Sequence, residues 1–146
     1  MPTWKEQAVI GAPVASVWEL VADPARYPEW AADVVEVTGL AEVVEHGTFE
    51  QTSRMPLGTT TTTYEIERLD DLHEIRLRCQ TSGYFSHWLL TPARDATFAE
   101  VEFGIEPTAP QYRLYFGILG KRYLRRSAEE TIAGLRRRLS CSTDAT

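Results

Sequence analysis

Several features that would mark a membrane or secreted protein are missing from this sequence of 146 residues. No stretch approaches the roughly 18 consecutive apolar residues of a membrane span, and residues 1–7 carry neither the basic nor the apolar run of a secretory signal. Cysteine is also scarce: Cys79 falls within a predicted strand and Cys141 in a polar tail. Two cysteines placed in this way suit a reducing compartment. We therefore expect a cytoplasmic protein with no membrane span.

Motifs for the common cofactors are missing as well. The sequence has no P-loop, no dinucleotide fingerprint and no Gly-x-Ser-x-Gly elbow. Its three histidines, His46, His73 and His87, lack the close spacing or neighbouring cysteine of a zinc site, and alternation along its strand predicts that His87 points outward. We expect no metal and no cofactor.

The charge of the chain is unevenly distributed. The net charge of −6 argues against general nucleic-acid binding, yet eight of the 15 basic residues lie in residues 111–146 beside three acidic ones. Two interpretations remain open for this basic segment. It is either a solvated face attracted to an acidic body, or a patch for an anionic membrane surface or an acidic partner.

The segment from Gln111 to Leu139 has the periodicity of a long amphipathic helix. Its apolar and small residues recur at three-and-four spacing, which indicates one face packed against a core. Gly117 and Gly120 interrupt its first third, and each costs about 1 kcal/mol relative to alanine in a helix interior. They indicate either a flexible or kinked first half or the close approach of another group.

The remainder of the chain predicts an α+β domain over residues 1–140, followed by a flexible tail over residues 141–146. A first strand at residues 4–10 precedes two short helices, the first with apolar residues from Val14 to Val21 and the second carrying Tyr27 and Trp30. Period-two alternation then predicts an antiparallel meander. Its strands are expected at residues 34–38, 49–55, 59–68, 75–79, 86–91 and 99–105. A sheet of six or seven strands curved around a single helix leaves room for a cavity.

The order of these elements, with the stretch APVASVWELVADPARYPEW at residues 12–30, resembles the SRPBCC superfamily. This superfamily has a helix-grip fold and includes START-related lipid-transfer domains, birch-pollen-allergen-type proteins and a polyketide cyclase/dehydrase group. The resemblance covers the whole chain and implies a cavity between the sheet and the C-terminal helix for a lipid or an aromatic polyketide. Strand parity and the helix face predict as its ligand-binding residues Trp30, Phe49, Gln51, Ser53, Tyr64, Ile66, Arg68, Leu77, Trp88, Leu90, Val101, Phe103, Tyr112, Tyr115, Phe116 and Leu119.

The same resemblance bears on catalysis. Aromatase/cyclases of the superfamily are described as using a tyrosine, an arginine and an asparagine, and ungapped matching puts these positions at Val34, Arg68 and near Thr131. Only the arginine is present, so Arg68 and Tyr64 are the remaining catalytic candidates, and we expect Arg68 to orient the polar end of a ligand.

Three functions remain open from the sequence. The preferred one is a carrier or binding protein for a hydrophobic small molecule, as a monomer or a homodimer. The second is a polyketide cyclase, aromatase or dehydratase that acts in the same cavity. The third is a protein or membrane-surface interaction module that uses the basic C-terminal helix.

Overall fold

Seven strands form one antiparallel sheet. The computed structural model describes residues 3–55, 58–106 and 110–144. In the last of these segments it describes the side chains of Pro110, Leu114 and residues 120–140. The strands lie side by side in the order β1-β7-β6-β5-β4-β3-β2, so β2 to β7 are the predicted meander and β1 pairs with β7 at its far edge. Their bounds are β1 Thr3–Ile10, β2 Val34–Thr38, β3 Thr48–Met55, β4 Gly58–Asp70, β5 Glu74–Cys79, β6 Tyr84–Ala93 and β7 Ala96–Ile105.

Two short helices fill the connection between β1 and β2. Helix α1 spans Val14–Val21 and the 3-10 helix η1 spans Pro24–Glu29. Asp23 caps η1, because its side chain accepts a hydrogen bond from the Ala25 N–H at 3.1 Å. The Tyr27 hydroxyl donates to the Val21 carbonyl at 2.6 Å and so ties the two helices together. These two helices, the curved sheet and the long C-terminal helix together confirm the predicted α+β helix-grip architecture.

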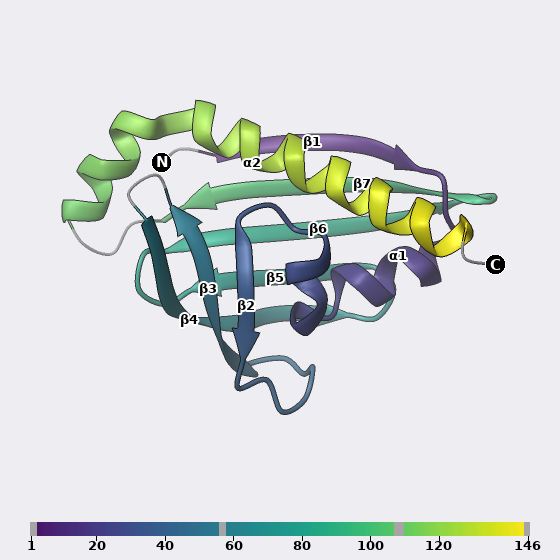
Figure 1. Ribbon diagram of the computed structural model, residues 1–146, viewed down its shortest axis with the longest axis horizontal. Helices are drawn as coiled ribbons and strands as arrows, with labels where there is room; N and C mark the ends of the chain where they lie inside the picture. Colours follow the sequence, from purple (N-terminus) through teal and green to yellow (C-terminus); the bar gives the residue numbers. More distant parts are fainter. Residues whose placement is uncertain (1–2, 56–57, 107–109, 145–146) are drawn as a thin grey trace.

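The C-terminal helix α2, Pro110–Asp144, crosses one face of the sheet (Figure 1). After Gly120 its packed face is the predicted one: Leu124, Ala128 and Leu135 are fully buried, and the helix contacts β1 and β7. At Gly120 the backbone leaves helical geometry with φ 52° and ψ −151°, and the segment before it bends away from the sheet (Figure 1). The kinked alternative is therefore correct. The helix also extends through residues 141–144, part of the segment predicted as a tail.

One close contact fixes the turn between η1 and β2 against α2. A Cβ atom at Gly134 would overlap the backbone carbonyl oxygen of Trp30, so the helix approaches this turn closely only because residue 134 has no side chain. One turn of helix earlier, the Thr131 hydroxyl accepts a hydrogen bond from the Ala32 N–H at 3.2 Å. On the other side, the Asp33 carbonyl accepts from the Arg54 N–H of β3 at 2.7 Å. Residues 30–33 are thus held between α2 and the sheet.

No helix that the structure describes combines the length and the apolar character needed to cross a membrane.

Truncation of the buried face of α2 tests this architecture. Leu135→Ala removes a fully buried side chain and should lower the free energy of unfolding by about 2 to 5 kcal/mol, measured by denaturant titration. Arg137→Ala, an exposed position on the same helix, is the control and should change it by less than about 0.5 kcal/mol. Equal small effects at both positions would mean that α2 does not pack on the sheet.

Candidate functional site

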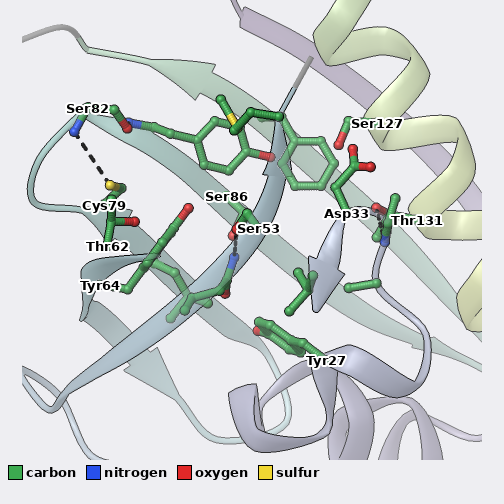
Figure 2. Close-up of a pocket in the computed structure, with 18 of the residues that line it drawn as sticks. Tyr27, Asp33, Ser53, Thr62, Tyr64, Cys79, Ser82, Ser86, Ser127 and Thr131 are labelled. Atoms are coloured by element: carbon green, nitrogen blue, oxygen red, sulfur yellow. Dashed lines mark hydrogen bonds between the residues drawn. The ribbon is translucent and has the colours of Figure 1, made fainter. Parts of the chain in front are cut away.

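A cavity of about 140 Å³ lies between the concave face of the sheet and α2 (Figure 2). Its walls come from the turn after η1, from β3 to β7 and from α2 after the kink. Among the residues predicted to line it, those that do so are Trp30, Gln51, Ser53, Tyr64, Leu77, Trp88 and Phe103. Of the 12 predicted residues whose side chains the structure describes, seven therefore line the cavity, and most of its wall is formed by residues that the prediction did not include.

Other predicted residues are buried but lie outside the cavity. Phe49, Ile66, Leu90 and Val101 belong to the same core cluster as Val17, Leu20 and Val21 of α1. None of these four is among the residues that line the cavity, so the part of the concave face that they occupy is filled by side chains. Parity identifies the face on which a residue lies, but it cannot tell which part of that face remains open. The side chains of Tyr112, Tyr115, Phe116 and Leu119 lie outside the described residues.

The prediction that Arg68 faces the cavity is wrong. In the pairing of β4 with β5, Ile66 lies opposite Leu77 but Arg68 lies opposite Arg76, so one extra residue separates the two pairs. Such a bulge reverses the alternation beyond it. The Arg68 side chain is accordingly 65% exposed on the outer face, where it forms an ion pair with Glu74 at 2.8 Å.

Glu74 also binds His87, which confirms the outward orientation expected for this histidine. The His87 Nε2 to Glu74 Oε2 distance is 2.5 Å. Burial by itself raises the pKa of the Glu74 carboxyl, but the hydrogen bonds from His87 and Arg68 outweigh it and leave this pKa below its usual range. Arg68, Glu74 and His87 therefore form an ionic cluster on the outer face of the sheet.

Hydroxyl groups that the prediction omitted make up much of the polar wall. Tyr84 and Ser86 share the inward parity of Trp88, and Ser127 and Thr131 lie on the packed face of α2, so the signal was present in the sequence. The turn of residues 31–34 has no periodicity and gave no such signal. The further lining residues are Tyr27, Ala31, Ala32, Asp33, Val34, Met55, Thr60, Thr62, Cys79, Thr81, Ser82, Tyr84, Ser86, Tyr123, Ser127 and Thr131.

Several of these polar groups bind one another. Gln51 Nε2 donates to the Ser53 hydroxyl at 3.0 Å. The Tyr123 hydroxyl of α2 lies 3.8 Å from the sulfur of Met55 on β3. Figure 2 shows Ser53 and Tyr64 together in one part of the cavity wall, while Asp33, Ser127 and Thr131 lie together in another.

A comparison with models of known protein families shows to which family this chain belongs. A family model described as polyketide cyclase / dehydrase and lipid transport matches residues 1–140. The chain belongs to this family. Comparison with the curated proteins gave no match.

Solved structures of several other proteins have the same fold at low sequence identity. The protein TTHA0849 from Thermus thermophilus is 18% identical with a TM-score of 0.77, over 97% of this chain and 99% of that one. A START superfamily protein from Mycobacterium smegmatis is 12% identical with a TM-score of 0.74, over 96% and 98% of the two chains. The di-domain ARO/CYC BexL from the BE-7585A biosynthetic pathway is 16% identical with a TM-score of 0.74, over 98% of this chain and 48% of that one.

Apart from the carboxyl group of Asp33, the polar groups that the described residues contribute to this cavity are neutral hydrogen-bonding groups. Burial raises the pKa of the Tyr64 phenol well above its usual value, and burial followed by the proximity of Tyr123 does the same for Tyr84. A phenol with a raised pKa is a weaker acid, which suits it poorly to general acid catalysis near neutral pH. Within the described residues, no group of three or more His, Cys, Asp or Glu side chains is placed to hold a metal ion.

The outer ionic cluster should contribute stability that depends on pH. Because the folded-state pKa of Glu74 is lowered, its contribution is fully present above the ordinary glutamate pKa of about 4.3 and is lost as the pH falls through the folded value. The difference in unfolding free energy between wild type and Glu74→Gln should therefore shrink between about pH 5 and about pH 3. Glu36→Gln, an exposed position on β2, is the control. A difference for Glu74→Gln that did not vary over this range would contradict the ion pairing.

Proposed function

We propose that the protein is a carrier or binding protein for a small hydrophobic molecule, which it holds in the cavity between the sheet and α2. The observation that carries this proposal is the mixed lining of the cavity. The rings of Trp30, Trp88 and Phe103 offer apolar surface, and the hydroxyls of Ser86 and Ser127 lie on the same enclosed space. A ligand with an apolar body and one or two polar atoms satisfies both kinds of wall.

The volume of the cavity favours a ligand of about one ring. An engineered cavity of about 150 Å³ in another protein binds benzene, and the present cavity measures about 140 Å³. Sites for drug-sized molecules are larger, at about 300 to 1,000 Å³. A fused polycycle or a lipid chain would therefore require the walls to move apart, whereas a single aromatic ring would not.

A polyketide cyclase or dehydratase is the second candidate, because the family description includes these activities. The positions of the side chains weigh against it. Arg68, matched to the arginine of the aromatase/cyclases, lies on the outer face of the sheet and is paired with Glu74. The buried phenols of Tyr64 and Tyr84 are weak acids. A binding protein needs none of these groups to be reactive.

The basic face of α2 offers little support for an interaction module. Arg125 and Arg126 form ion pairs with Glu129 and Glu130, each at 2.9 Å and one helical turn apart. Pairs of this kind are ordinary features of a solvated helix surface, and they leave less uncompensated positive charge for an anionic membrane. Of the three functions, this one has the weakest support.

A substitution that fills the cavity tests the preferred function. Ser86→Phe places a ring where a ligand would lie and should weaken the binding of benzyl alcohol at least tenfold, measured by calorimetric titration. Thr91→Phe introduces the same ring at an exposed position of the same strand and should leave binding unchanged. Both proteins should give the wild-type circular dichroism spectrum.

Two outcomes would count against the proposal. If the wild-type protein takes up no member of a panel of single-ring aromatics, the cavity is not a site for molecules of this size. If benzyl alcohol binds to Ser86→Phe as tightly as to wild type, it binds elsewhere.

A further inference from the structure

Asp33 is the one formally charged side chain among the described residues that line the cavity. It lies in the turn between η1 and β2, where its backbone takes the left-handed conformation with φ 65°. Aspartate and asparagine tolerate this conformation better than other residues with side chains do. Because the Asp33 carbonyl is bound by the Arg54 N–H and the preceding Ala32 N–H by Thr131, the backbone that carries this carboxylate is fixed on both sides.

The carboxylate of Asp33 has no hydrogen bond or ion pair with any residue that the structure describes, although the residue is half-buried. Burial, followed by the nearby Glu130, raises the pKa of this carboxyl, and Arg126 and Arg54 only partly offset the effect. Arg126 is itself paired with Glu130 at 2.9 Å. Neither Arg126 nor Arg54 forms a hydrogen bond or an ion pair with the Asp33 carboxylate among the described residues, and Arg126 is held by Glu130 instead.

Two hydroxyl side chains of α2 lie beside Asp33 on the cavity side. Figure 2 shows Asp33 beside Ser127 and Thr131 of α2. Tyr84 of β6 is close enough for Asp33 to raise the pKa of its phenol. A carboxylate accepts hydrogen bonds, and the neighbouring hydroxyls can accept them too. A ligand group that fits beside them therefore needs several N–H or O–H donors.

We propose that Asp33 and the neighbouring hydroxyls bind the protonated amino group of a small hydrophobic amine, whose apolar body lies against Trp30 and Trp88. This inference rests on the proposed binding function and specifies its ligand class. A charged donor gains most from an unpaired carboxylate in a partly dry site, and an ammonium also interacts favourably with aromatic faces. An anionic ligand is disfavoured, because the described part of the cavity wall offers it no arginine or lysine and presents the negative Asp33.

The experiment compares four molecules of nearly equal shape: toluene, benzyl alcohol, benzylamine and benzoate. Calorimetric titration measures each against wild type, Asp33→Asn and Arg68→Met. Asparagine keeps the shape of the side chain and tolerates the left-handed backbone, so it removes the charge alone. Arg68→Met changes a charge on the outer face of the sheet and is the control.

We expect wild type to bind benzylamine at least tenfold more tightly than toluene, with benzoate the weakest. In Asp33→Asn the preference for benzylamine over toluene should fall by about tenfold or more, while toluene binds as before. In Arg68→Met the wild-type order and affinities should remain. The ranking of the four molecules on wild type tests the inference even if Asp33→Asn does not fold.

The outcomes separate the two proposals. If toluene or benzyl alcohol binds but benzylamine binds no better, or if Asp33→Asn weakens all four molecules equally, the amine site is wrong and the binding function stands. If benzoate binds most tightly, the charge argument is wrong in sign. If none of the four binds to wild type, both proposals fail.

Discussion

The close contact between Gly134 of α2 and the backbone of Trp30 is the constraint on which the site depends. It allows the helix to lie against the turn after η1, where Thr131 also holds the Ala32 N–H. Any larger residue at position 134 would push the turn away from the helix, because the group it meets is backbone and cannot rotate aside. The same turn carries Asp33 and one wall of the cavity. A packing contact outside the cavity thus determines its shape.

The cavity itself follows from where the chain has large and small side chains on one concave face. Part of that face is filled by Ile66, Leu90 and Val101, and the packed face of α2 contributes Leu124 and Leu135 to the same core. Ser86 of β6 and Ser127 of α2 are small side chains on the cavity wall. Protein interiors are normally close-packed, so small polar residues at inward positions that leave space unfilled call for an explanation.

The sequence predicted the elements well because alternation and helical periodicity directly reflect burial. It placed Trp30, Tyr64 and Trp88 correctly on the cavity for the same reason. It failed at Arg68, because a bulge inserts one residue without any mark in the composition and reverses every position beyond it. It also passed over Asp33, since a turn held by contacts distant in sequence has no period to read.

These two failures together change the electrostatics of the site. With Arg68 inside, the cavity would have a positive end and suit an oxygenated or anionic ligand. Because of the bulge, the Arg68 guanidinium lies on the outer face, where it pairs with Glu74. The irregular turn after η1 contributes the carboxylate of Asp33 to the cavity wall. The formally charged group on the described cavity wall is therefore acidic and not basic, and the aromatic residues Trp30, Trp88 and Phe103 line the cavity as expected. In a family whose fold accommodates several activities, selectivity of this kind depends on a few irregular backbone positions more than on the regular strands that surround them.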